Sequence, residues 1–147
     1  MWVKGFLKKL PLTILIDYGS THNFIYPRII KRDDCFVHIC SSFKVMISNG
    51  GTLPCKGKCH NVRISIGDYA LHYKMFSMPL VGCDVILGTQ WLHTLGPILL
   101  DFIELWMQYS VNGKKNTLKG LQPRYITIIS SHNMKKILKK NSQGVIA

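Results

Sequence analysis

One short stretch constrains the fold more than any other: an apolar run that ends in a charge. Residues Leu12 to Ile16 read Leu-Thr-Ile-Leu-Ile, and Asp17 follows directly. A continuous apolar run of this length is typical of a strand buried on both faces. A carboxylate at the end of such a strand is costly unless hydrogen bonds satisfy it or it has a function. Gly19 and Ser20 follow and indicate a turn, so Asp17 is the first candidate functional residue.

The chain up to residue 120 shows the short runs of a β protein. Segments expected to be strands are 12–16, 43–48, 62–66, 71–76, 85–88, 98–102 and 105–111. Residues 91–96 predict one short helix that is closed by Gly96. Residues 22–43 are mixed in character and predict a loop over the sheet. We therefore expect an all-β domain with one short helix.

Two Asn-Gly pairs mark hairpins in this pattern. Asn49-Gly50 and Asn112-Gly113 each separate two strand-like runs. Both central residues of a type I′ turn need positive φ, which asparagine and glycine tolerate. The first hairpin has Pro54 in its second arm, which restricts that arm to a sheet edge. We expect this hairpin to project from the body of the domain.

The net charge of +12 is concentrated at the two ends of the chain. Lysines cluster within residues 1–9 and again within residues 114–140, whereas the middle is closer to balanced. No nucleic-acid recognition motif accompanies these charges, so solvated basic ends are favoured over a dedicated nucleic-acid surface. No run approaches the ~20 apolar residues that a membrane-spanning helix needs. We therefore expect neither a specific nucleic-acid partner nor a membrane partner.

The cysteines predict a reducing environment. Their count is odd, at positions 35, 40, 55, 59 and 83, and their spacing matches no disulfide framework. This is typical of free thiols in an intracellular, cytoplasmic protein. Cys55, Cys59 and His60 suggest zinc, but no second ligand pair stands at a usual spacing. Strand alternation puts Cys55, Gly57 and Cys59 on one face, so we expect core cysteines and no metal.

The chemistry available to Asp17 needs a second carboxylate. Two carboxylates about 3 Å apart cannot both ionise, so one serves as acid and the other as base toward a water molecule. Asp84 and Asp101 are not followed by a glycine turn of the same form. The partner carboxylate would therefore come from a second copy of the chain across a two-fold axis.

Several motifs in order resemble one family. They are Asp17-x-Gly19-Ser20-Thr21-His22-Asn23-Phe24-Ile25, the Asn49-Gly50 hairpin, and the run from Leu80 through Asp84-Val85-Ile86-Leu87-Gly88 to Trp91-Leu92. Leu95-Gly96-Pro97-Ile98, Asp101-Phe102, Gly113 and 118–120 continue the match. Together they resemble the retropepsin-like aspartic protease segment of plant gypsy-type retrotransposon Gag-Pol polyproteins.

The resemblance implies a fold, a site and a substrate. The fold would be an all-β, retropepsin-like half-barrel with a flap hairpin, covering residues 1–120. Asp17 would be catalytic in a homodimer that hydrolyses peptide bonds of its own polyprotein and uses no cofactor. Ser48, Asn49, Gly50 and Gly51 would form the tip of the flap, and Ile86, Leu87 and Gly88 would support the catalytic loop. Residues 121–147 would be a basic linker toward a reverse transcriptase.

The sequence departs from the family at Tyr18. The family has serine or threonine there, whose hydroxyl links the two catalytic loops across the dimer. A phenolic oxygen lies several bonds further out and cannot take that position, and each buried partner left unpaired costs about 1–3 kcal/mol. Gly19 and Ser20, which permit the turn and orient the aspartate, are retained. Two readings therefore stay open: an endopeptidase, or a catalytically impaired remnant that dimerises or binds peptide.

Overall fold

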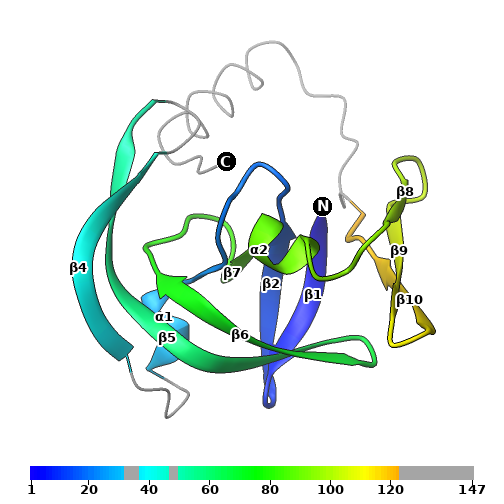
Figure 1. Cartoon of the computed structure of the whole chain (residues 1–147), viewed down its shortest axis with the longest axis horizontal. Helices are drawn as coiled ribbons and strands as arrows, with labels where there is room; N and C mark the ends of the chain where they lie inside the picture. Colours follow the sequence, from blue (N-terminus) through cyan, green and yellow to red (C-terminus); the bar gives the residue numbers. More distant parts are fainter. Residues whose placement is uncertain (32–36, 47–49, 123–147) are drawn as a thin grey trace, which may run out of the picture.

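The computed structural model describes residues 1–31, 37–46 and 50–122, with side chains for all of these except 37–43 and 56. Ser48, Asn49 and the basic tail from residue 123 onward therefore lie outside the described residues. The described chain forms ten strands and two short helices (Figure 1). In chain order these are β1 (Trp2–Leu7), β2 (Leu10–Ile16), β3 (Phe24–Ile25), α1 (Pro27–Ile30), β4 (Val37–Met46), β5 (Thr52–Ile66), β6 (Tyr69–Ser77), β7 (Val85–Leu87), α2 (Thr89–Leu92), β8 (Leu99–Asp101), β9 (Trp106–Val111) and β10 (Lys114–Lys119).

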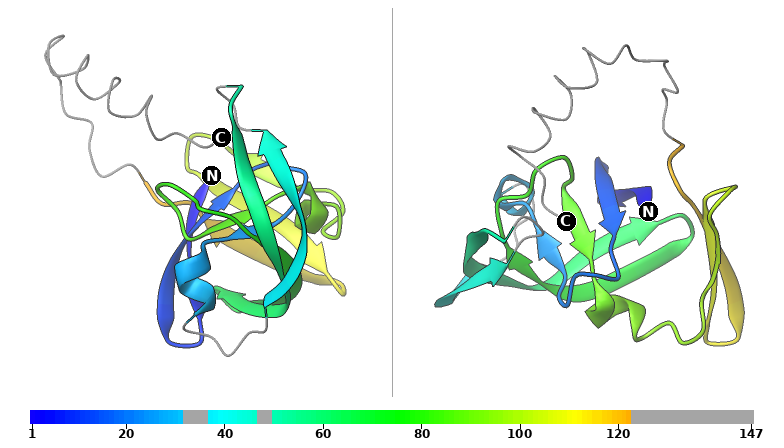
Figure 2. Two further views of the ribbon diagram at one scale, coloured as in Figure 1. Left: turned by 90° about the vertical axis from the view of Figure 1, so that its left-hand side faces the viewer. Right: turned by 90° about the horizontal axis from the view of Figure 1, so that it is seen from above.

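Seven of the strands form one strongly curved sheet in the order β1-β2-β7-β3-β6-β5-β4. An additional pairing of Phe6 in β1 with Ser65 in β5 joins strands far apart in this order and closes the sheet into a small barrel. The other strands form a separate sheet in the order β10-β9-β8, which Figure 2 shows beside the barrel. The predicted all-β fold is confirmed.

The apolar run that opened the sequence analysis forms β2, in the middle of the barrel wall. It pairs antiparallel with β1 and parallel with β7. Leu12, Ile14 and Ile16 are buried, whereas Thr13 and Leu15 are half-buried. The expectation of full burial is therefore wrong for one face of β2. That face carries Thr13 and Leu15, and strand alternation places Asp17 on the same side.

The expectation of a loop over residues 22–43 is wrong. Within it the chain forms β3, α1 and the beginning of β4 at Val37. β3 pairs with β6 and β7, which are distant in sequence, so its two residues carry no local signal. α1 begins at Pro27, whose fixed φ suits the first helical position. The described chain thus has two short helices rather than one, and no helix in it has the length and apolar character needed to cross a membrane.

The turn predictions fare better. Asn112 and Gly113 have φ of 52° and 75° and join β9 to β10, as the hairpin prediction requires. The predicted helix begins two residues earlier than expected and ends at Leu92, so the expectation that Gly96 closes it is wrong; Gly96 lies four residues further on, with φ of 68°. The first hairpin pairs β4 with β5 and contains Gly50 at φ of 83°. Pro54 lies where β5 pairs with β4 alone, since β6 joins β5 only from Gly57 onward.

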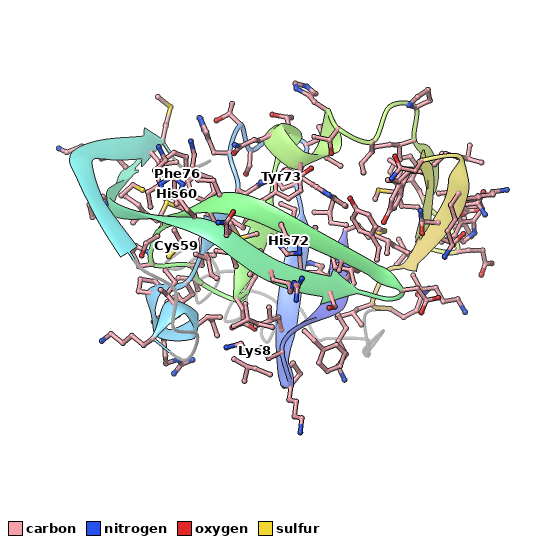
Figure 3. The ribbon with its side chains drawn as sticks, turned by 60° about the horizontal axis from the view of Figure 1, so that its bottom comes forward. Lys8, Cys59, His60, His72, Tyr73 and Phe76 are labelled. Atoms are coloured by element: carbon pink, nitrogen blue, oxygen red, sulfur yellow. The ribbon has the colours of Figure 1, made fainter. Side chains whose placement is uncertain are left out.

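Two clusters of buried side chains fill the domain. The first cluster is the main core, built from β1, β2, β3, α1, β5, β6, β7, α2 and the small sheet. The second cluster consists of Phe24, Met78, Leu80, Cys83 and Ile86 with Leu15, Tyr26, Val45, Leu53 and Phe76 packed against it. Figure 3 shows the long β5–β6 pair that borders both clusters.

The cysteine predictions can be checked at three positions. Cys55 and Cys59 are fully buried and Cys83 is buried, and all three are free thiols. Gly57 is buried on the same strand, so the alternation predicted for β5 is confirmed. Burial, with the nearby charge of Asp84, raises the pKa of the Cys83 thiol to about 11. A protonated, buried thiol is a core residue rather than a reactive one.

Candidate active site

Asp17 stands where β2 ends and the chain turns away from the sheet. Its backbone N–H donates to the carbonyl oxygen of Leu87 at 3.0 Å, which extends the parallel β2–β7 pairing by one residue. The chain then turns back, and the N–H of Ser20 donates to the Asp17 carbonyl oxygen at 3.2 Å. The Asp17 side chain is half-buried. The sheet therefore fixes this residue without enclosing it.

Both oxygens of the Asp17 carboxylate are held by the residues that follow it. The backbone N–H of Gly19 donates to Oδ1 and the hydroxyl of Ser20 donates to Oδ2, each at 2.9 Å. Hydrogen bonds to a carboxylate are stronger than those between neutral groups. The carboxylate is thus oriented by its own loop, while each oxygen keeps a lone pair for a further donor.

Gly88 supports this loop from below. It follows β7 directly, and a Cβ at this position would overlap the backbone carbonyl oxygens of Ser20 and His22. Its φ of −98° is open to any residue, so only space demands glycine here. The loop from Asp17 to His22 therefore rests directly on the backbone at Gly88.

The beginning of α2 fastens the same loop. The backbone N–H of Thr89 donates to the Ser20 carbonyl oxygen at 2.7 Å, and the Thr89 hydroxyl donates to the Thr21 carbonyl oxygen at 3.3 Å. Together with Leu87 and Gly88, Thr89 attaches the loop at several consecutive residues. Of the segment predicted to support the loop, Leu87 and Gly88 contact the loop from Asp17 to His22 directly.

Asn23 is a part of the site to which the sequence analysis gave no role. Its side chain is fully buried, and its Oδ1 accepts a hydrogen bond from the Gly88 N–H at 3.0 Å. Its backbone oxygen accepts from the Phe76 N–H at 2.9 Å, which links the loop to β6. The sequence did contain a signal for this role. Asn23 lies between the Gly19-Ser20 turn and the apolar pair Phe24-Ile25, and a buried amide at such a position requires hydrogen-bond partners.

Tyr18 projects outward from the turn. Its side chain is 83% exposed, although its neighbours in the sequence, Asp17 and Gly19, are hydrogen-bonded to each other. The ring has no part in holding Asp17 within one chain.

The flap hairpin is described only in part. Gly50 and Gly51 are exposed, and the strands below them pair from Phe43 opposite Cys55 to Met46 opposite Thr52. Val45 and Leu53, one from each arm, pack against the second cluster. The hairpin arms and the half-buried face of β2 therefore contact the same group of side chains.

The other carboxylates of the described residues lie outside this loop. Asp84 accepts a hydrogen bond from the Thr13 N–H at 2.8 Å, and Asp101 closes the turn after β8 by accepting from two backbone N–H groups. No group of His, Cys, Asp and Glu side chains in the described ranges could hold a metal ion. One described chain thus offers one carboxylate for water activation.

A charged group close to Asp17 is the amino group of Met1, which donates to the Ile16 carbonyl oxygen at 2.9 Å. Burial lowers the pKa of this amino group, and the Asp17 charge partly opposes that shift.

A closed barrel, a hairpin over one face and an aspartate in a tight Gly-Ser turn define the fold of retropepsin-like acid proteases. Residues 3–100 match the family model described as retroviral aspartyl protease, and the chain belongs to this family.

Solved structures share the fold at low sequence identity. The retroviral protease-like domain of Ddi1 from Leishmania major is 12% identical, with a TM-score of 0.60 over 86% of this chain and 97% of that one. The EIAV protease in complex with the inhibitor HBY-793 is 17% identical, with a TM-score of 0.53 over 69% and 92%. No curated protein matches the chain in sequence.

Proposed function

We propose that the chain is one subunit of a homodimeric aspartic endopeptidase that cuts a polypeptide. The observation that carries the proposal is the Asp17 carboxylate, half-buried and held through both oxygens by Gly19 and Ser20. A single such carboxylate in the described chain calls for a second copy, and homo-oligomers with two-fold symmetry supply one at low cost.

In this proposal the two copies of Asp17 share one proton across the two-fold axis. The ionised carboxylate takes a proton from a water molecule as its oxygen attacks the peptide carbonyl carbon. The protonated carboxyl gives its proton to the carbonyl oxygen. Collapse of the tetrahedral intermediate breaks the C–N bond, and the amine leaves with a proton from the dyad.

The same proposal covers the polyprotein from which the chain derives and the cellular compartment in which it lies. The motif series supports a plant gypsy-type retrotransposon polyprotein, with residues 1–120 as the protease and 121–147 as the link toward a reverse transcriptase. The buried free thiols of Cys55, Cys59 and Cys83 support a reducing, intracellular compartment.

A second candidate function is a non-catalytic dimerisation or peptide-binding module of the same fold. The exposed ring of Tyr18, where the family has serine or threonine, favours it. Ddi1, a retroviral protease-like domain by its description, carries this fold in a protein that is not described as a viral protease.

Peptide cleavage at mildly acidic pH by the wild type, Asp17→Asn and Tyr18→Ser separates the two functions. We expect Asp17→Asn to abolish cleavage, because the dyad loses both of its ionisable groups. Tyr18→Ser should raise cleavage, because it restores a hydroxyl that can cross the dimer. Cleavage by Asp17→Asn at the wild-type rate would refute the site.

Sedimentation velocity at tens of micromolar tests the dimer directly. A strictly monomeric wild type that remains monomeric as Tyr18→Ser would contradict the protease proposal. A dimer without cleavage in either form would support the non-catalytic module.

A further inference from the structure

A row of side chains crosses the sheet from the catalytic loop to β5. The register pairs Leu15 with Ile86, Ile86 with Phe24, Phe24 with Phe76 and Phe76 with Lys58. Residues directly opposite each other in paired strands point to the same face of the sheet. Neighbouring strands lie ~4.8 Å apart, so this row extends about 19 Å along the sheet.

The row lies on the Asp17 face of the sheet. Its first four members all belong to the second cluster or pack against it. Asp17 follows Leu15 by two residues, and strand alternation puts both on one face. Val45 and Leu53 of the hairpin arms pack against the same cluster. A polypeptide held between the catalytic loop and the hairpin would therefore lie along this row.

The far end of the row is basic. The ammonium nitrogens of Lys58 and Lys74 lie 5.8 Å and 6.0 Å from the centre of the Phe76 ring. Lys74 precedes Phe76 by two residues on β6 and so shares its face. The ring of His22, from the catalytic loop, meets the Phe76 ring edge-on at 5.2 Å between centroids.

The two ammonium groups repel each other. The proximity of the Lys58 side chain, together with desolvation, lowers the pKa of Lys74. No carboxylate of the described residues is among the groups that act on it. A carboxylate placed between the two would turn this repulsion into two attractions, and the Phe76 face already holds both cations in position.

We propose that Lys58 and Lys74, over the ring of Phe76, form a substrate subsite for an acidic side chain. The proposal rests on the proposed protease function and names its substrate class: a polypeptide with Asp or Glu at a distance from the scissile bond. An extended chain rises ~3.4 Å per residue, so a row of about 19 Å corresponds to about five to six residues along a straight path, and the acidic residue lies at most about six residues from that bond.

Nucleic-acid phosphate is the other anion that two lysines could bind. The row that leads from Lys58 to Leu15 is apolar throughout and ends beside Asp17, which a phosphate backbone does not match. The observations therefore favour a peptide carboxylate.

The test is a set of fluorescein-labelled decapeptides with apolar centres, in which a single Glu or Gln moves through each position. Binding to Asp17→Asn protein is measured by fluorescence anisotropy, so that cleavage does not interfere. In one or two neighbouring positions we expect Glu to bind about fivefold more tightly than Gln, as for a partly screened ion pair. The preference for Glu should disappear in a triple variant that combines Asp17→Asn with Lys58→Gln and Lys74→Gln.

The matched control is Asp17→Asn with Lys114→Gln and Lys115→Gln, which removes the same charge from two exposed lysines of β10. It should keep the Glu preference. The proposal is overturned if no position prefers Glu, if no peptide binds, or if both double substitutions reduce the preference equally. Loss of oligouridylate binding specific to Lys58 and Lys74, without a Glu preference, would assign the site to nucleic acid instead.

Cleavage of the same peptides by the wild type distinguishes this inference from the proposed function. Cleavage without a Glu preference would leave the protease standing and remove the subsite. A Glu preference without cleavage in any form would leave the subsite standing and remove the catalytic activity.

Discussion

Replacing Gly88 with alanine should displace the catalytic loop. The added Cβ would lie 2.5 Å from the carbonyl oxygen of His22, whereas ordinary contact begins at 3.4 Å, and it would also overlap the Ser20 carbonyl. Both are backbone atoms, so the loop must retreat by about 0.9 Å instead of a side chain rotating away. Overpacking of this kind costs about 1–3 kcal/mol. The hydrogen bonds from Thr89 and to Asn23 weaken with it, so we expect a loss of about 3 kcal/mol.

Urea unfolding followed through the fluorescence of the fully buried Trp91 measures this loss. A displacement close to 1 Å beside the reacting groups should also lower any peptidase activity by about 100-fold. Gly96→Ala is the matched control: Gly96 lies in the turn after α2, at φ of 68°, and a Cβ there would have nothing within 4 Å. It should cost about 1 kcal/mol of backbone strain and leave activity unchanged. Gly88→Ala with wild-type stability and activity would refute the idea that the loop rests on this backbone.

Two further predictions concern single groups. Ser20→Ala removes the hydroxyl that donates to Asp17 at 2.9 Å, so it should lower the free energy of unfolding by about 1 kcal/mol and peptidase activity about tenfold. The control Thr21→Ala should change neither quantity. Equal activities of the two variants would contradict the orienting role of Ser20. Burial raises the pKa of Cys83 from 9.0 to about 11 and that of Tyr109 from 10.0 to about 12, so the unfolded state loses these protons first. The free energy of unfolding should therefore be fully present below about pH 9 and fall as pH rises toward 11–12, which urea midpoints at several alkaline pH values measure; a rising midpoint would contradict it.

The parts of the site that follow from local chemistry could be predicted from the sequence. The apolar run before Asp17, the Gly-Ser turn after it and the Asn-Gly pairs each act within a few residues. A turn that needs positive φ, as at Asn112, selects its residue types directly. The strand before Asp17, the turn after it and the Asn112-Gly113 hairpin are confirmed because nothing distant is required to form them, whereas burial of the strand on both faces depends on distant segments and was predicted wrongly.

The parts that were missed depend on contacts between distant segments. β3 exists because β6 and β7 each supply hydrogen bonds to its two residues. Asn23 has a role because Gly88, 65 residues away, presents its N–H to the amide oxygen. The row from Leu15 to Lys58 depends on four strand registers at once. No local pattern determines which residues of such strands face each other.

The way the loop is attached separates catalytic geometry from dimerisation. Leu87, Gly88 and Thr89 hold the Asp17 loop through contacts within its own chain. In the proposed homodimer, these contacts need no second copy, and the partner would supply its own carboxylate. Tyr18 takes no part in these contacts and is 83% exposed. Tyr18→Ser should therefore change the dimer dissociation constant and leave the unfolding free energy of the subunit nearly unchanged. A large change in that free energy would mean that the ring supports the loop itself, and the two roles would not be separable.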